Sequence, residues 1–346
     1  TSRLSPAVLL IGHGTRRADG IAEFYGLATQ LQQALPDRTC LAGFLELVEP
    51  SLLEALESLW QQGFRRITTL PVLLMAAGHV KNDIPAVLNA FQAKHPGLEI
   101  AFSADLGVHS KLLYVARERI ESIEIEFGLD YDRRDTLLVV IGRGSSDPDA
   151  NSNISKITRI LWEGMGFDWA ETAYIAVTAP LMADALERTH RLGFPRVVVF
   201  PYLLFAGRLV EQVHATVAAH QDRHTDIQVV VAPHLNAHPL VVETFLERLA
   251  EAEYGEAWHR AGMRGNKGTA WLGGTHASSF WRWPGTLQPA DVPALAAHVD
   301  FFPTIAEIAG AKLDDATRRQ IEGRSLLPLL KDPGAPWPDR TLFTHL

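Results

Sequence analysis

The chain has 346 residues, a formal net charge of −8 and a single cysteine, Cys40. The acidic balance provides no general basic surface for nucleic acid. One cysteine excludes intrachain disulfides and cysteine-cluster metal sites, and it fits a reducing compartment. No apolar run approaches the roughly 18 residues that span a membrane, and residues 1–6 carry no signal-peptide pattern. We therefore expect a cytoplasmic protein of two or three domains that binds neither nucleic acid nor membrane.

The first part of the chain alternates between two patterns. Continuous apolar runs predict buried strands at 7–11, 40–44, 66–74 and 98–102. Apolar residues at helical spacing predict helices at 21–35, 51–62, 82–93 and 110–127. Strands that alternate with helices of this length indicate an α/β fold with a parallel sheet covered on both faces.

The same pattern then occurs a second time. Gly-Arg-Gly at 142–144 follows an apolar run, as Gly-His-Gly at 12–14 does 130 residues earlier. Further matches are Pro180 with Pro50, residues 193–196 with 63–66, and 201–204 with 71–74. The second copy ends with a predicted strand at 229–233 and a helix at 240–254. We infer a duplicated domain with a hinge near 130–135.

Three polar positions are not kept in the second copy. His13 becomes Arg143, Glu46 becomes Ala176 and His79 becomes Arg208. All three follow predicted strand ends, and ligands of open α/β sheets bind outside the carboxyl ends of the strands. Two imidazoles and a carboxylate there suit a divalent first-row metal. Glu49 is a rival carboxylate, and the alternative interpretation is two loop histidines and a capping glutamate without a ligand.

These residues carry a resemblance to a known family. Its blocks are residues 10–16, 43–46 with 49–52, 71–74 and 78–85. They resemble the class II tetrapyrrole chelatases, in particular the long, two-half form of the sirohydrochlorin cobaltochelatase and ferrochelatase group. The resemblance covers about residues 5–253, and ordered blocks at matching strand ends make it specific.

The resemblance implies a fold and an activity. The expected fold is two tandem flavodoxin-like, three-layer α/β/α domains with parallel sheets that face each other across a cleft. The expected enzyme is a lyase that inserts Co²⁺, or next Fe²⁺, into sirohydrochlorin in cobalamin or sirohaem biosynthesis. Ni²⁺ suits the same ligands, and the metal is a substrate, so no organic cofactor is expected. The family's metal-binding histidines map onto His13 and His79, and its acidic group onto Glu46.

Metal insertion requires metal ligands and a proton acceptor, which histidine and glutamate can provide. The metal must lose water and lie over the ring, and two pyrrole nitrogens must lose protons. Neutral imidazole is a good but exchangeable ligand for Co²⁺ or Fe²⁺. His13 or His79 can also accept a pyrrole proton, because an unperturbed histidine titrates near pH ~6.5. Glu46 would offset the charge of the metal or relay a proton.

Basic residues near these positions suit the substrate, which is a polycarboxylate. Arginine pairs with carboxylates in a bidentate manner. We expect Arg143 and Arg208 to hold substrate carboxylates from the second half, and Arg16 and Lys81 from the first. The alternative is that the two replacement arginines are solvated and have no role. We expect a monomer, because a duplicated chain forms its own cleft.

The other histidines of the second copy receive a different interpretation. They are His214, His220, His224, His234 and His238. No matched carboxylate is apparent for them in the sequence, so we expect solvated or hydrogen-bonded side chains rather than ligands.

The last segment breaks the pattern, so we divide the chain into 1–130, 131–255 and 256–346. Residues 256–346 resemble the C-terminal part of a sulfatase, whose sulfate-contacting lysine maps onto Lys267. Leu272 and His276 replace a glutamate and an arginine of the family pattern, and its Cys/Ser-x-Pro-x-Arg nucleophile motif is missing. We therefore expect no sulfatase activity, and an irregular tail that packs poorly or serves as an interaction surface.

Two other functions stay open. Gly-His-Gly-Thr at 12–15 is similar to the Arg-His-Gly of histidine phosphatases and mutases, in which histidine attacks phosphorus. Gly12 replaces the expected arginine there, so this function ranks below the chelatase. A non-enzymatic metal carrier would use the same ligands as the chelatase.

Overall fold

The computed structural model describes residues 5–128, 132–260 and 294–338, with single residues and short pieces between 281 and 292 and at 340. The side chains of residues 79, 80 and 254–260 lie outside this description. The chain falls into two compact units, Thr1–Ala257 and Trp258–Leu346. No helix in the described parts combines the length and the apolar character that crossing a bilayer requires.

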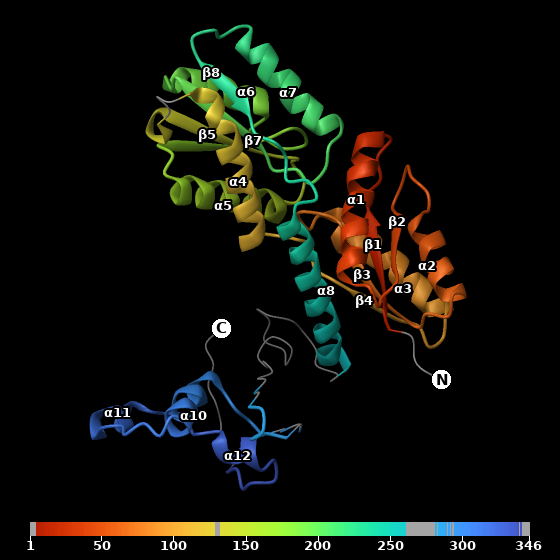
Figure 1. The fold of residues 1–346 in the computed structure, drawn as a ribbon, viewed down its shortest axis with the longest axis vertical. Helices are drawn as coiled ribbons and strands as arrows, with labels where there is room; N and C mark the ends of the chain where they lie inside the picture. Colours follow the sequence, from red (N-terminus) through yellow and green to blue (C-terminus); the bar gives the residue numbers. More distant parts are fainter. Residues whose placement is uncertain are drawn as a thin grey trace. The chain divides into compact units, whose positions relative to one another are not determined.

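The first half of the larger unit (residues 5–128) is built around one parallel sheet (Figure 1). Its strands lie in the order β2-β1-β3-β4 and are β1 Ala7–Gly12, β2 Cys40–Phe44, β3 Arg66–Pro71 and β4 Glu99–Phe102. Its helices are α1 Ala18–Ala34, α2 Leu52–Gln61, α3 Ile84–Lys94 and α4 Ser110–Glu124, with a π-helical turn His79–Asp83 before α3 and a 3-10 turn Ile125–Phe127 after α4.

The second half (residues 132–253) repeats this architecture. Its sheet has the order β6-β5-β7-β8, with β5 Thr136–Gly142, β6 Trp169–Tyr174, β7 Arg196–Pro201 and β8 Gln228–Val231. Its helices are α5 Pro148–Met165, α6 Met182–Leu192, α7 Arg208–Gln221 and α8 Pro239–Arg260, after a 3-10 turn Arg133–Asp135. The predicted α/β fold with two tandem parallel sheets is confirmed.

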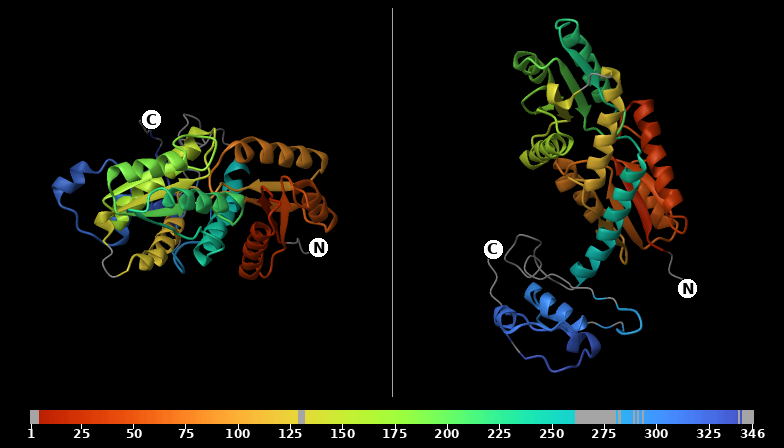
Figure 2. Two further views of the ribbon diagram at one scale, coloured as in Figure 1. Left: turned by 90° about the horizontal axis from the view of Figure 1, so that it is seen from above. Right: turned by 60° about the vertical axis from the view of Figure 1, so that its left-hand side comes forward.

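Continuous apolar strands explain the three layers of each half. β1 lies inside its sheet and all six of its residues are buried. Val8 and Leu10 belong to the apolar cluster that contains the buried face of α1. Leu9 and Ile11 point to the opposite face and pack in the cluster that contains α2 and α3. Helices therefore cover both faces of each sheet, as the views of Figures 1 and 2 show.

The third strand is shorter than predicted. We expected it to reach residue 74, and β3 ends at Pro71. Proline has no N–H for the ladder, and Val72 makes the last ladder bond, from its N–H to the carbonyl of Ile11 at 2.8 Å. The carbonyls of Leu73 and Leu74 accept bonds from the loop at 106–107 instead. The chain therefore leaves the sheet early and forms a longer loop before α3.

The long helices that end the two halves are exchanged between the sheets. α4 belongs to the first half in sequence, yet it packs on α5 and β7 of the second (Figure 1). α8 returns to the first half, where Glu253 accepts a 2.9 Å hydrogen bond from Thr68 Oγ1 of β3 and pairs with Arg38 at 2.5 Å. Each half thus receives a helix from the other, and one continuous apolar cluster contains residues of both halves.

Charged side chains join the carboxyl edges of the two sheets. Arg17, after β1, pairs with Glu211 of α7 at 2.5 Å. Lys81, after β3, pairs with Asp147, just before α5, at 2.5 Å. Arg17 and Asp147 are equivalent positions of the repeat. The segment after the first strand of each half therefore meets the segment after the third strand of the other, as an approximate two-fold axis requires.

The smaller unit contains short helices rather than wholly irregular chain. They are a 3-10 turn His298–Asp300, α10 Phe301–Ile308, α11 Asp315–Gln320 and α12 Leu327–Lys331. Asp300 is fully buried and accepts hydrogen bonds from the backbone N–H groups of Ala297 and Arg324 and from the Arg340 guanidinium. Burial alone would raise the pKa of Asp300, but these bonds outweigh it and lower the pKa to about 2. Phe301, Phe302 and Ile305 are exposed, so poor packing or an interaction surface stays the prediction for this segment.

Candidate functional site

The site begins where β1 ends. Two backbone bonds continue the pairing of β1 with β2 past the strands, from Leu45 N to Gly12 O at 3.0 Å and from Glu46 N to His13 O at 3.1 Å. The backbone thus carries His13 and Glu46 side by side to the carboxyl edge of the sheet. This register places an imidazole and a carboxylate at the edge where parallel α/β sheets bind ligands.

Gly14 allows the two chains to approach this closely. Its φ is +98°, and a Cβ at this position would lie 1.7 Å from the carbonyl oxygen of Glu46. No side chain larger than hydrogen fits without a shift of the backbone. The glycine after the histidine is therefore a geometric requirement of the His13–Glu46 pair.

The structure brings His13 together with one of the two candidate carboxylates. Nδ1 of His13 lies 3.3 Å from Oε1 of Glu46, and the two side chains are 28% and 53% exposed. Glu49 is exposed and leads into Pro50 and the N-cap of α2. Both members of the pair are accessible to a metal ion and to a large substrate.

His79 opens the π-helical turn after β3, on the same side of the sheet as the end of β1. Its side chain lies outside the described part of the structure. The backbone therefore places His79 near the carboxyl edge, as predicted, and its role as a ligand stays a prediction.

The second half keeps the scaffold of this site and lacks its ligands. Ile175 N and Ala176 N donate to Gly142 O and Arg143 O at 3.0 and 3.1 Å, as in the first half. Gly144 has a φ of +88°, and a Cβ there would lie 1.9 Å from Ala176 O. Since the turn is the same in both copies, His13 and Glu46 are not needed to form it.

The four basic residues predicted to bind substrate carboxylates differ in their ion pairs. Arg16, Arg143 and Arg208 are exposed at the carboxyl edges, and within residues 5–128 and 132–253 no carboxylate forms an ion pair with them. Lys81 instead pairs with Asp147 at 2.5 Å and with Asp149 at 3.3 Å. Lys81 thus connects the two halves in this structure, and the three arginines are the more accessible cations.

The interpretation of the remaining histidines needs one correction. His234 contacts Glu23 at 3.1 Å, as expected of a hydrogen-bonded side chain. His220 and His224 both contact Glu187, and His238 lies 3.4 Å from Glu118. Like His234, these histidines therefore have carboxylate partners, and the expectation of no matched carboxylate is wrong for all four. Glu187 lies on α6, more than thirty positions away in sequence. Helix spacing within one segment does not reveal such a partner.

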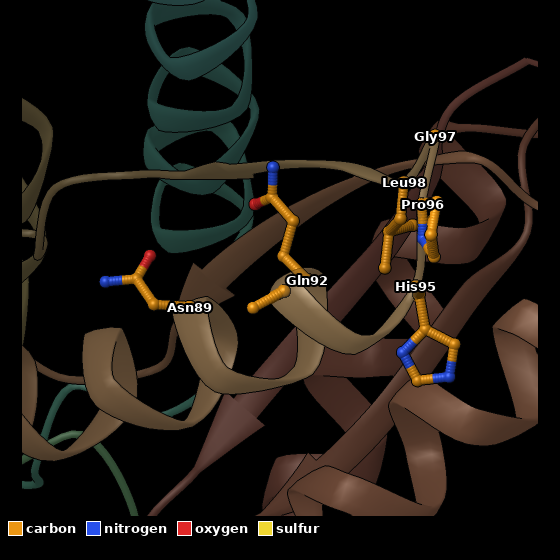
Figure 3. Close-up of a pocket in the computed structure, with 7 residues that line it drawn as sticks. Asn89, Gln92, His95, Pro96, Gly97 and Leu98 are labelled. Carbon is orange, nitrogen blue, oxygen red and sulfur yellow. The ribbon is translucent and has the colours of Figure 1, made fainter.

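A surface depression of the first half lies elsewhere. Asn89, Gln92, His95 and Pro96 line it at the end of α3, where the chain leads into β4 (Figure 3). The His95 ring already has a hydrogen-bond partner there, because its Nδ1 lies 2.8 Å from the carbonyl oxygen of Phe91. This depression lies at the amino edge of the sheet, opposite His13.

The duplicated sheets, with a histidine and a carboxylate at one carboxyl edge, define a chelatase-like α/β enzyme. The profile of the CbiX family matches residues 7–123 and again 137–252. The chain belongs to the CbiX family.

Sirohydrochlorin chelatases are similar to this chain in sequence and in structure. The sirohydrochlorin cobaltochelatase of Priestia megaterium is 33% identical over 252 residues, which cover 72% of this chain and 81% of that protein. The sirohydrochlorin ferrochelatase of the same organism is 28% identical over 233 residues, or 67% of this chain and 85% of that one. The crystal structure of the sirohydrochlorin chelatase SirB from Bacillus subtilis subspecies spizizenii, in complex with cobalt, has a TM-score of 0.62 and 25% identity, covering 73% of this chain and 97% of that one.

The smaller unit has a separate likeness. Steryl-sulfatase of Rattus norvegicus is 44% identical over 68 residues, 19% of this chain, and the match covers 11% of the sulfatase. The predicted resemblance of the tail is therefore to a small fraction of a sulfatase. Lys267, Leu272 and His276, on which the sequence comparison rested, lie outside the described residues.

Proposed function

We propose that this chain inserts a divalent metal ion into sirohydrochlorin, with Co²⁺ as the first candidate and Fe²⁺ as the next. The observation that carries the proposal is the His13–Glu46 pair, whose Nδ1 and Oε1 atoms are 3.3 Å apart, in a turn whose copy holds Arg143 and Ala176. The names of the similar cobaltochelatase and ferrochelatase supply the substrate. The product would lie on the way to cobalamin or sirohaem.

The geometry of the pair suits a metal held for transfer. Two ligands of a tetrahedral ion with bonds of about 2.1 Å lie roughly 3.4 Å apart, close to the 3.3 Å between His13 and Glu46. His79 would complete the ligand set from the loop after β3. Side chains that are 28% and 53% exposed leave room for a macrocycle to approach the ion from solvent. Neutral imidazole releases Co²⁺ or Fe²⁺ more easily than a thiolate cage would.

Insertion also requires the removal of two pyrrole protons. An imidazole nitrogen of His13 or His79 accepts one as the metal leaves it, and the other passes to solvent water at this exposed edge. Glu46 balances the charge of the ion before transfer and stabilises the imidazolium formed afterwards. The metal is thus the substrate, and the chain supplies ligands and a base.

The experiment that tests the proposal is an insertion assay. The purified chain is mixed with sirohydrochlorin and Co²⁺ in the absence of oxygen, and the absorption spectrum of the macrocycle is followed. A chelatase raises the rate far above the uncatalysed reaction. Metal binding without a higher rate would indicate the carrier, and turnover of a phosphate ester would indicate the phosphatase. Fe²⁺ and Ni²⁺ in parallel reactions rank the metals.

Glu46 and Glu49 form a matched pair of carboxylates for a first prediction. We expect Glu46→Ala to lower kcat by about 10²-fold or more, since it removes the group beside His13. We expect Glu49→Ala to stay within about threefold of the unchanged chain, because Glu49 is exposed and the carboxylate that contacts His13 is that of Glu46. Steady-state insertion rates check both. Equal losses in the two variants would contradict the assignment.

The exposed arginines supply a second prediction, for substrate binding. We expect Arg143→Ala combined with Arg208→Ala to raise KM for sirohydrochlorin about tenfold, or ~1.4 kcal/mol, with little change in kcat. The control is Arg117→Ala with Arg159→Ala, which removes the same charge from exposed positions on α4 and α5. An unchanged KM in the first double variant would show that these arginines are solvated replacements.

Contacts between the halves support a monomer. The ion pairs Arg17–Glu211 and Lys81–Asp147 join the two carboxyl edges within one chain. A second copy is therefore not needed to complete the arrangement that the proposal uses.

A further inference from the structure

A cluster of histidines lies between two helices of the second half, away from His13. Glu187 and His190 lie on α6, His220 lies on α7, and His224 follows three residues after α7 ends. α6 and α7 pack against each other on one face of the second sheet (Figure 1). Asp226 precedes β8 at the edge of the cluster.

The ligand atoms of the cluster converge. Nδ1 of His220 and Nε2 of His224 lie 3.4 and 3.1 Å from the two carboxylate oxygens of Glu187. One ligand atom from each of these three residues lies within 4.8 Å of the others. The His190 and His224 rings have centroids 4.0 Å apart, and His190 Nδ1 is 3.8 Å from Asp226. Separations near 3.4 Å are those between ligands of a tetrahedral first-row ion.

The burial of His220 is a second observation that indicates a bound ligand. Its side chain is 1% exposed, its Nδ1 has only the 3.4 Å contact with Glu187, and its Nε2 has no hydrogen-bond partner among the described residues. Buried polar atoms without a partner are rare in folded proteins. Burial, and then the neighbouring His224, lower the pKa of His220. A buried imidazole beside Glu187 and His224 is therefore a candidate ligand.

The repeat shows that the fold does not require these imidazoles. Glu187 and His224 have counterparts in Glu57 and His95 of the first half, 3.7 Å apart at equivalent positions. The counterparts of His190 and His220 are the apolar rings of Trp60 and Phe91, which pack on His95 with centroids 4.8 and 4.0 Å away. The second half thus has imidazoles in the places where the first half has an indole and a phenyl ring.

We propose that Glu187, His220 and His224, with His190 and Asp226 beside them, form a second site for a divalent first-row transition metal of the Zn²⁺ or Co²⁺ type. The donor set of imidazoles and one carboxylate is typical of such ions. Arg223 pairs with Glu187 at 2.9 Å and is 60% exposed, so this side chain moves into solvent when the ion binds. The site is separate from His13 and takes no part in metal insertion.

The test compares metal binding by the full chain and three variants. His220→Phe introduces the residue that occupies the equivalent position in the first half, so it keeps the packing and removes a ligand. His224→Ala removes the ligand shared by both subsets of the cluster. His214→Ala is the control, an exposed histidine on the same α7. Zn²⁺ and Co²⁺ are titrated by calorimetry, the visible spectrum of Co²⁺ is recorded, and thermal unfolding is followed with and without Zn²⁺.

We expect His220→Phe and His224→Ala to weaken one equivalent of Zn²⁺ binding at least 100-fold and to abolish the Zn²⁺-dependent rise in Tm. His214→Ala should bind as the unchanged chain does. His220→Phe should have an unchanged or higher Tm without metal, which separates loss of a ligand from loss of fold. Arg223→Ala should strengthen binding, because Glu187 then loses its competing cation.

Two results would overturn the second site. One is that His220→Phe and His224→Ala bind Zn²⁺ and Co²⁺ as tightly as the unsubstituted chain does. The other is a Zn²⁺-dependent rise in Tm that survives both substitutions. The proposed insertion activity is tested separately, because His224→Ala should keep the insertion rate of the unchanged chain whereas His13→Ala should keep the second site.

Discussion

His13→Ala should lower kcat/KM for metal insertion by about 10³-fold or more, which corresponds to at least ~4 kcal/mol of lost transition-state stabilisation. The substitution removes a metal ligand and a candidate base together. The side chain is 28% exposed, and the turn around it forms equally well in the second half with arginine. The fold should therefore persist, and the loss should appear in kcat rather than in Tm.

The measurement is the initial rate of the change in macrocycle absorption at fixed Co²⁺ and varied sirohydrochlorin. His214→Ala is the matched control, since it removes an exposed imidazole from α7, outside both clusters of ligands. Circular dichroism and Tm show whether the variants fold alike. Normal turnover by His13→Ala would end the assignment of the metal site, whatever the effect of the other substitutions.

Gly14→Ala should destabilise the protein by about 1–3 kcal/mol or more and also abolish insertion. The added Cβ would lie 1.7 Å from the Glu46 carbonyl, at a φ of +98° that alanine rarely adopts. To relieve the clash, the two backbones must separate, and His13 and Glu46 then move apart. Denaturant unfolding measures the loss of stability, and the insertion assay on the folded fraction measures the loss of activity.

Gly144→Ala is the internal control for this effect. A Cβ there would lie 1.9 Å from the Ala176 carbonyl at a φ of +88°, so the steric cost is similar. The turn in the second half carries Arg143 in place of the ligand. We expect a comparable loss of stability with insertion largely kept per folded molecule. If both variants lost activity equally, stability and not the geometry of the pair would explain the effect of Gly14→Ala.

Much of the fold could be predicted because local rules and tertiary packing agree in it. The apolar run of β1 is buried on both faces, as such a run predicts. Pro50 and Ser51 mark the start of α2, where Ser51 and Glu54 form a capping box. The duplication was visible because each copy must satisfy the same packing, including glycines at 14 and 144 with positive φ.

Contacts between distant segments could not be predicted in this way. Nothing in the helical pattern of α4 or α8 tells which sheet it covers, since an amphipathic helix fits either apolar face. The pairing of Thr68 with Glu253 is a property of the assembled unit. Lys81 was expected to bind substrate, and its pairing with Asp147 depends on the approximate two-fold relation of the halves.

The histidine cluster could not be predicted from helical spacing either, but a comparison of the two copies of the repeat indicates it. Glu187 and His220 come from different helices, so spacing along one helix does not join them. The repeat, however, places His220 opposite Phe91 and His190 opposite Trp60. A difference between the two copies at such positions is also what made His13 a candidate ligand.

The sequence alone determined the parallel α/β architecture, the duplication and the candidate role of His13, since strand burial and turn geometry are encoded within short segments. Only the tertiary structure shows the contact of Glu46 with His13, the exchange of α4 and α8 between the sheets and the contact of Glu187 with His220. These are contacts between side chains from separate elements. They depend on how the sheets and helices pack, which no single segment specifies.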